Sequence, residues 1–188
     1  MATVKLIGMS GSLRAGSFSN AILETLREKF ADRADLRVYD LAPIPAYNQD
    51  FEGDKRPPPV KQMLADIEAA DGLVLCAPEF NHSIPGVLKN ALDQAYKEWT
   101  RKPFMAIGYG GVGAARAIEH LRLIGVELQM VSTHAAVHIG GSDFMAIHPM
   151  RGKKPIEEIE ANLLPSAKTA LDELVWWTNA LKAARAKA

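Results

Sequence analysis

The amino-acid sequence predicts an α/β fold in which a parallel sheet carries helices on both of its faces. Short β-branched apolar runs alternate with longer segments of helical period along the chain. The strand-like runs lack polar alternation, as the run at 72–77 illustrates, which is typical of strands covered on both faces. With 188 residues, 48% hydrophobic and 23% charged, the chain is expected to form one domain over 1–188.

The expected strands and helices follow one another in regular alternation. Strands are expected at residues 4–9, 36–39, 72–77, 103–108 and 128–132, with 136–139 as a continuation of the last one. Apolar residues at helical spacing mark the five helices, within 22–30, 60–67, 84–95, 114–124 and 170–181. Pro165 is expected to start the last helix or to kink it. This order fits a flavodoxin-like doubly wound five-stranded sheet with strand order 2-1-3-4-5.

The segment after the first strand, residues 10–20, is rich in hydroxyl groups and opens the first helix. Its polar side chains include Ser10, Ser12, Arg14, Ser17 and Ser19. In a sheet of this order, ligands bind where strands one and three end. A helix N-terminus presents free N–H groups and positive dipole charge, and an arginine adds donors that match phosphate oxygens. The segment therefore predicts a metal-free site for a phosphomonoester.

Competing motifs do not fit this segment. Gly11 and Gly16 have Walker A spacing, but Ser17-Phe18 stands where Lys-Ser/Thr is required. The dinucleotide pattern G-x-G-x-x-G is absent from residues 10–20. A receiver-type phosphoacceptor site needs acidic residues, whereas the first acid of the chain is Glu24. A turn that only caps the helix is the simpler alternative. Four hydroxyls and an arginine exceed what one cap needs.

The segment after the third strand, residues 78–86, offers a partner for a planar ring. Phe80 supplies an aromatic face, and Asn81 and the loop amides supply donors and acceptors. Phosphate at the first loop and a ring at this one would suit a mononucleotide cofactor.

The two loops together resemble the NAD(P)H-dependent FMN reductase family, which includes quinone, chromate and azo-dye reductases. The matching patterns are G-S-L-R-x-G-S at 11–17 and P-E-F-N-H-S-I-P-G-V-L-K-N-A-L-D at 78–93. A third matching element is Y-G-G-V-G at 109–113, and the resemblance spans residues 3–125.

The resemblance implies FMN as the cofactor and NADPH or NADH as the co-substrate. The FMN phosphate would be held by Ser12, Arg14, Ser17 and Ser19, with Ser10 and Phe18 close enough to join them. The ring would be lined by Pro78, Glu79, Phe80 and Asn81 and closed in by Tyr109, Gly110 and Gly111. No catalytic side chain and no metal ligand are expected, because the flavin supplies the chemistry.

The implied reaction passes hydride from NAD(P)H through the flavin to a small-molecule acceptor in a ping-pong mechanism. The acceptor would be a quinone, free flavin, an azo dye or a metal oxyanion. The alternatives are a non-enzymatic electron-transfer flavoprotein and a flavin-free ligand-binding domain of the same fold. The resemblance also implies a homodimer or homotetramer, with the third helix and the loop at 42–59 at the interface.

Charge and composition restrict the classes of molecule that the protein is expected to bind. There are 22 basic and 22 acidic residues, and the resulting zero net charge argues against a nucleic-acid surface and against an acidic electron carrier. Residues 1–23 nevertheless contain Lys5 and Arg14 and no acid, which predicts a local electropositive site. The single cysteine, Cys76, excludes an internal disulfide and is expected to be buried. Without an apolar stretch of membrane length or a signal peptide, we expect a cytoplasmic protein.

Two further polar groups have alternative interpretations. His134, His138, Asp143 and His148 are conceivable metal ligands, but strand-edge or interface histidines are the favoured interpretation. Arg116 is expected either to contact a nicotinamide dinucleotide phosphate or, preferably, to form an interface ion pair.

Overall fold

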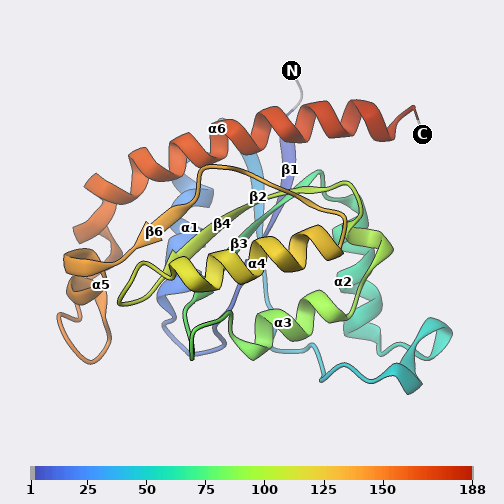
Figure 1. Cartoon of the computed structure of the whole chain (residues 1–188), viewed down its shortest axis with the longest axis horizontal. Helices are drawn as coiled ribbons and strands as arrows, with labels where there is room; N and C mark the ends of the chain where they lie inside the picture. Colours follow the sequence, from blue (N-terminus) through green and yellow to red (C-terminus); the bar gives the residue numbers. More distant parts are fainter. Residues whose placement is uncertain (1–2, 188) are drawn as a thin grey trace.

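A parallel sheet lies between two layers of helices in the computed structural model, which describes residues 3–187 (Figure 1). The strands run in the order β2-β1-β3-β4-β5, and a sixth strand also pairs with β4. Every pairing is parallel, which confirms the predicted doubly wound sheet. The strands are β1 (Val4–Ser10), β2 (Ala34–Tyr39), β3 (Gly72–Pro78), β4 (Pro103–Tyr109), β5 (Val131–Ser132) and β6 (Val137–Ile139).

The outer strand departs from the prediction because it is split into β5 and β6. Phe104 of β4 pairs with Ser132 of β5, and Ile107 of β4 pairs with Val137 of β6. Between these two positions β4 contains three residue steps and the outer strand contains five. The extra residues leave the ladder as a bulge. The Glu173 carboxylate accepts the N–H groups of His134 at 2.7 Å and Ala135 at 2.8 Å, so the bulge keeps its hydrogen bonds.

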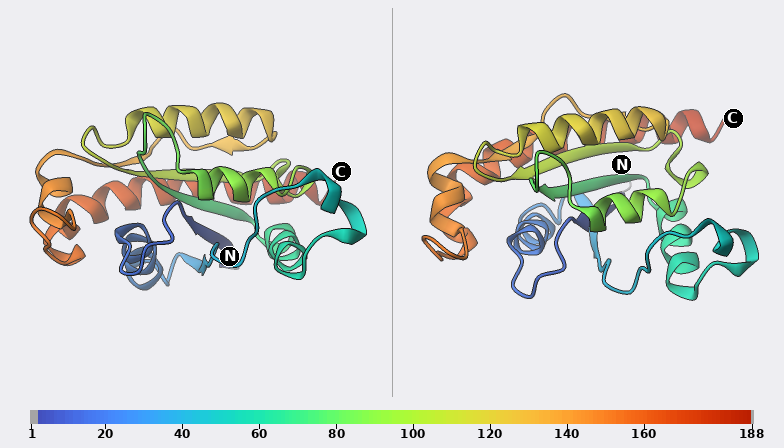
Figure 2. Two further views of the ribbon diagram at one scale, coloured as in Figure 1. Left: turned by 90° about the horizontal axis from the view of Figure 1, so that it is seen from below. Right: turned by 60° about the horizontal axis from the view of Figure 1, so that its bottom comes forward.

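The helices form one layer on each face of the sheet (Figure 2). The first layer consists of α1 (Phe18–Lys29) and α6 (Glu160–Arg185). The second layer consists of α2 (Pro58–Ala69), α3 (Gly86–Asp93) and α4 (Ala115–Glu127). The last helix begins at Glu160 and contains Pro165, so the expectation that Pro165 starts it was wrong.

Side chains along each strand point alternately to the two faces of the sheet, so the hydrophobic core is divided into one cluster under each helix layer. Val4 and Leu6 of β1 join the cluster that packs against α1 and α6, whereas Ile7 and Met9 join the cluster under α2, α3 and α4. Since the strands are parallel, the loops after β1, β3, β4 and β6 all emerge at one edge of the sheet. The short helix α5 (Gly141–Ile147) lies at that edge.

The loop at 42–59 lies at the opposite end of the molecule from α5 (Figures 1 and 2). It contains two 3-10 turns, η1 (Gln49–Phe51) and η2 (Gly53–Lys55). The Asn90 side chain of α3 holds this loop with two hydrogen bonds: it accepts the N–H of Tyr47 at 2.8 Å and donates to the Pro45 carbonyl at 2.9 Å.

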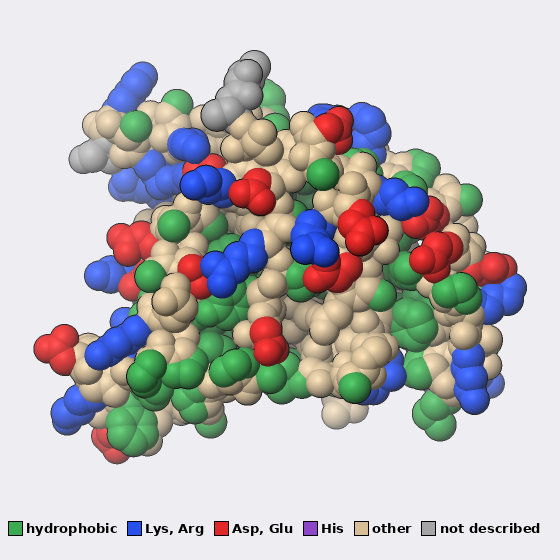
Figure 3. Space-filling model, turned by 180° about the vertical axis from the view of Figure 1, so that it is seen from behind, with side chains coloured by type: hydrophobic (Ala, Val, Ile, Leu, Met, Phe, Trp, Pro, Cys, Tyr) green, Lys and Arg blue, Asp and Glu red, His purple; other side chains and the backbone are tan. Residues whose placement is uncertain are grey.

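Acidic and basic side chains are interspersed on the face shown in Figure 3, in keeping with the balanced total charge. Within residues 3–187, every helix is too short or too polar to traverse a lipid bilayer.

Candidate cofactor-binding site

A cavity of about 130 Å³ lies between the loops after β1, β3 and β4 and the turn that follows α5. None of its lining residues carries a carboxylate. Eight of the ten belong to the predicted cofactor set, so the fold brings the two predicted loops together. The lining residues are Ser12, Arg14, Ser17, Phe18, Ser19, Pro78, Phe80, Tyr109, His148 and Pro149.

The N-terminus of α1 is open toward an anion. Ser17 precedes the helix in an extended conformation, its side chain makes no capping hydrogen bond, and no acid occupies the first turn. The first N–H groups of a helix have no partner within it, so those of α1 stay available to a ligand. The loop closes through a Ser17 N–H bond to the Arg14 carbonyl at 3.0 Å, and Gly16 adopts a φ of +65°, which favours glycine.

Arg14 adds a positive charge to this loop. Its guanidinium donates to the Gly16 carbonyl at 3.1 Å. Among the salt bridges of the described chain, none involves Arg14. The charge is therefore not neutralised by a carboxylate and can bind the phosphate of a ligand.

Ser10 does not line the 130 Å³ cavity but stabilises the loop after β1 by hydrogen bonds. It is buried, and its hydroxyl donates to the Ser12 carbonyl at 3.1 Å and accepts the Ser12 N–H at 3.2 Å. Gly11 N–H donates to the Cys76 carbonyl at 2.7 Å, which fixes this loop against β3. Ser10 contributes to a second cavity on the other side of the loop.

The second cavity is larger, about 260 Å³, but it suits an anion poorly. It lies between the loop after β1 and the end of β2. Its lining includes the carboxylates of Glu24 and Asp40, which would repel a phosphate dianion. The smaller cavity, with Arg14 and no acid, is therefore the better phosphate site.

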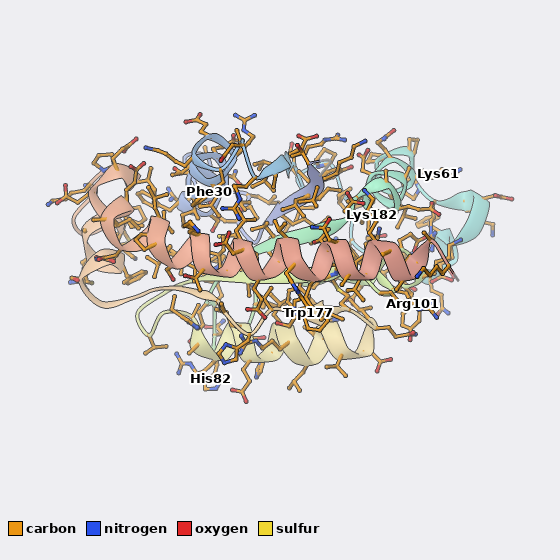
Figure 4. The ribbon with its side chains drawn as sticks, turned by 90° about the horizontal axis from the view of Figure 1, so that it is seen from above. Phe30, Lys61, His82, Arg101, Trp177 and Lys182 are labelled. Atoms are coloured by element: carbon orange, nitrogen blue, oxygen red, sulfur yellow. The ribbon has the colours of Figure 1, made fainter. Side chains whose placement is uncertain are left out.

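The loop after β3 is a tight turn. Phe80 and Ser83 exchange backbone hydrogen bonds at 3.0 and 3.1 Å, and the corner residues Asn81 and His82 have φ of 49° and 71°. Positive φ at both corners is the geometry of a type I′ turn, and non-glycine residues adopt it at a cost. A hydrogen bond of 2.9 Å joins Ser83 Oγ to His120 Nδ1 on α4, beside which His82 lies (Figure 4). The turn leaves the Phe80 side chain 57% exposed.

The Glu79 side chain is only 6% exposed and forms an ion pair with Arg116 at the start of α4. Burial acts to raise the pKa of Glu79, but the Arg116 guanidinium and the nearby N–H groups of residues 116 and 117 outweigh it and lower the pKa. Within the chain Arg116 is thus paired with Glu79, and the expected interface ion pair stays a prediction. The Glu79 N–H also donates to the Tyr109 carbonyl at 2.9 Å, which joins the loops after β3 and β4.

Tyr109 presents an unsatisfied hydroxyl to the site. Its Oη is buried and has no hydrogen-bond partner within the described chain. Burial raises the pKa of Tyr109, and the Arg14 charge partly offsets this rise. The ring packs between Phe18 and Phe144, with centroid distances of 6.2 and 5.0 Å. A buried hydroxyl without a partner is costly, so a polar ligand group at this position would be favoured.

The two remaining predicted residues, Gly110 and Gly111, follow Tyr109. Gly110 N–H donates to the Ile139 carbonyl of β6 at 3.1 Å, whereas a Cβ added at Gly111 would meet no other atom within 4 Å. The loop is thus fixed at its start and leaves room for a ligand at Gly111.

Comparison with known proteins identifies the family. The model of the NADPH-dependent FMN reductase family matches residues 4–143. The chain belongs to this family. Membership makes it a flavin-dependent NAD(P)H oxidoreductase, and it confirms the predicted FMN cofactor and NAD(P)H reductant.

Individual members of the FMN reductase family and their structures agree with this assignment. An NAD(P)H-dependent FMN reductase of Pseudomonas aeruginosa is 38% identical over 125 residues, covering 63% of this chain and 68% of that protein. A quinone reductase of Escherichia coli is 30% identical over 180 residues, covering 92% and 95%. The structure of FerB, a flavoenzyme NAD(P)H:(acceptor) oxidoreductase from Paracoccus denitrificans, matches with a TM-score of 0.77 and 26% identity over 94% and 98% of the two chains.

Two lining residues of this FMN reductase, His148 and Pro149, were not predicted as cofactor contacts. They directly follow α5, at the end of the helix that the sequence did not predict. The sequence suggested His148 only as a conceivable metal ligand. Over the described residues, no group of three or more His, Cys, Asp or Glu side chains is arranged to hold a metal ion.

Proposed function

We propose that the 130 Å³ cavity holds the phosphate of FMN and that the flavin ring lies over the loops after β3 and β4. The observation that carries this proposal is the open start of α1 beside Arg14, in a cavity without carboxylates. The hydroxyls of Ser12, Ser17 and Ser19 add neutral donors, and the unpartnered Tyr109 hydroxyl adds another. These groups suit a phosphate dianion and its ribityl chain.

The ring contacts in this proposal come from both neighbouring loops. Pro78 and Phe80 already line the cavity, while Glu79 and Asn81 contribute mainly their backbone, because the Glu79 carboxylate is held by Arg116. Gly110 and Gly111 bound the ring on the β4 side, where Gly111 leaves open space. The type I′ turn fixes the backbone of this surface before the ring binds, which reduces the entropy lost on binding.

The chain's own residues bind and orient, and they are not required to exchange protons. Bound FMN supplies the redox chemistry, taking hydride from NADPH or NADH and delivering it to an acceptor. Arg14 and the start of α1 fix the phosphate end, and the loops after β3 and β4 set which face of the ring is open. The exposed Phe80 side chain offers an apolar surface at that open face.

We propose quinones as the acceptor class. The Escherichia coli relative is named a quinone reductase, and a relative from Solanum tuberosum is named an NAD(P)H:quinone oxidoreductase. The latter is 37% identical over 135 residues. Free flavin, azo dyes and metal oxyanions are the competing acceptors to compare in the same assay.

We also propose that the chain works as a homodimer or homotetramer in the cytoplasm, where NADPH and NADH are available. Apolar side chains are exposed on α4, with Leu123 64% and Val126 74% exposed, and on the loop at 42–59, with Phe51 52% exposed. In the proposed oligomer these side chains would be removed from water at the interface. Light scattering at micromolar concentration tests the proposal, and a monomer mass alone would contradict it.

An absorption spectrum followed by anaerobic mixing with NADPH or NADH tests the proposed function. The purified protein, reconstituted with FMN, should show flavin absorbance that bleaches rapidly with the nucleotide and returns with a quinone. A protein that binds no FMN would contradict the proposed site. A protein that binds FMN but is not reduced would instead favour an electron carrier.

A further inference from the structure

The turn that follows α5 forms a wall of the phosphate cavity that the family pattern does not include. The family model matches residues 4–143, whereas His148 and Pro149 of this turn line the cavity. Figures 1 and 2 show α5 at the same end of the molecule as the loop before α1. The match to the family model therefore ends before this part of the cavity.

The wall is fixed by hydrogen bonds. Lys153 N–H donates to the His148 carbonyl at 3.2 Å, and Gly152 N–H donates to the Met145 carbonyl at 3.0 Å. A Cβ at 152 would overlap the Ala146 carbonyl, so the turn depends on glycine there. The segment is also held to α6, because the Asn162 amide donates to the Asp143 carboxylate at 3.0 Å.

The His148 ring is oriented by two contacts. Its Nδ1 lies 3.1 Å from the backbone nitrogen of Met150. A backbone N–H only donates, so Nδ1 accepts, and the neutral ring carries its proton on Nε2. The ring also packs edge-on against Phe144, with centroids 4.9 Å apart, and Phe144 packs against Tyr109. Nε2–H is therefore the polar group of this ring that remains for a ligand.

We propose that His148 Nε2–H donates a hydrogen bond to the phosphate of the cofactor, as a further lining residue of the cavity. The inference rests on the proposed function of this cavity. His148 lines the same cavity as Arg14 and Ser17, and none of the lining residues is acidic. All three side chains can donate hydrogen bonds, and an anionic ligand in the cavity could accept from all of them. His148 would thus help the site to distinguish FMN from riboflavin, which lacks the phosphate.

The test compares FMN and riboflavin affinities of the full chain by quenching of flavin fluorescence. His148→Phe keeps an aromatic ring against Phe144 and removes the donor. It should weaken FMN binding roughly 10- to 100-fold, the range for one hydrogen bond to a charged group, and leave riboflavin binding within about twofold. His148→Gln, which retains an amide donor, should bind FMN within about fivefold of the wild type.

Three outcomes would overturn the proposal. The first is equal FMN affinity of His148→Phe and the wild type. The second is equal weakening of FMN and riboflavin, which would make His148 a packing residue. The third is that His148→Gln loses as much affinity as His148→Phe, while circular dichroism shows both variants folded. A wild-type chain that binds no FMN would instead contradict the proposed function itself, so the two failures are distinguishable.

Discussion

Glu173→Gln should destabilise the outer edge of the sheet and loosen the bulge between β5 and β6. The wild-type carboxylate accepts two N–H groups, from His134 at 2.7 Å and Ala135 at 2.8 Å. An amide has one acceptor oxygen, so one of the two bonds is lost. Hydrogen bonds to a charged group are worth roughly 1.5–3 kcal/mol, and partial exposure places the expected loss at about 1–2 kcal/mol. For a chain of this size, that is a fall in Tm of roughly 2–8 °C.

The pH dependence follows from the same contacts. Burial acts to raise the pKa of Glu173, but the N–H groups of Ala135 and His134 outweigh it, so its pKa lies below the usual value of 4.5. A lowered pKa in the folded state gives stability that is present above pH 4.5 and lost as the pH falls through the folded value. The difference in unfolding free energy between wild type and Glu173→Gln should therefore shrink in acid.

Urea denaturation at pH 7 and at pH 4 measures this difference, with Glu28→Gln as the control. Glu28 is an exposed glutamate of α1, and its substitution should change the unfolding free energy by less than about 0.5 kcal/mol. Equal stability of Glu173→Gln and Glu28→Gln at pH 7 would refute the reasoning. So would a difference that grows as the pH falls.

Three further predictions concern particular backbone and titratable groups. Gly16→Ala should cost about 1–2 kcal/mol of stability, because the φ of +65° strains any Cβ, whereas Gly111→Ala, also in open space but without a positive φ, should be nearly neutral in urea denaturation. Burial lowers the pKa of Lys102 from 10.5 to about 8, so the folded state binds fewer protons than the unfolded state between about pH 8 and 10.5. The unfolding free energy of the wild type, compared with that of Lys102→Met, should therefore rise as the pH increases over this range. Burial raises the pKa of the Cys76 thiol to about 12. Ellman's reagent should therefore leave the folded protein unlabelled at pH 8 and label it in urea. Fast labelling of the folded protein would contradict the buried position of Cys76.

The sheet could be predicted because its strands are buried on both faces and read as continuous apolar runs. The split of the outer strand could not, since it depends on the Glu173 carboxylate, which is far along the chain from the bulge it satisfies. The local sequence at 133–136 does not reveal that partner. Of the two expectations for Pro165, the helix start was wrong: α6 begins at Glu160, directly after the 3-10 turn η4 (Ile156–Ile159), and contains the proline.

The candidate site was predictable where it consists of short loops at strand ends. Topology alone brings the loops after β1 and β3 together, and eight predicted residues line the cavity. His148 and Pro149 come from a later segment, whose position depends on the packing of α5 against η4 and on the Asn162–Asp143 hydrogen bond, so local spacing gave no indication of them. The Arg116–Glu79 ion pair could not be predicted, because helix-end arguments consider only the helix of Arg116, whereas Glu79 lies on another loop.

Simultaneous removal of the Arg14 and Ser12 side-chain donors tests the central claim most directly. The claim is that the start of α1, with these two residues, binds the FMN phosphate. The Arg14→Ala/Ser12→Ala variant should remain folded, bind FMN at least roughly 10-fold more weakly than wild type, and bind riboflavin with unchanged affinity. If the double variant still purifies with one FMN per chain, the phosphate lies elsewhere and the account is wrong.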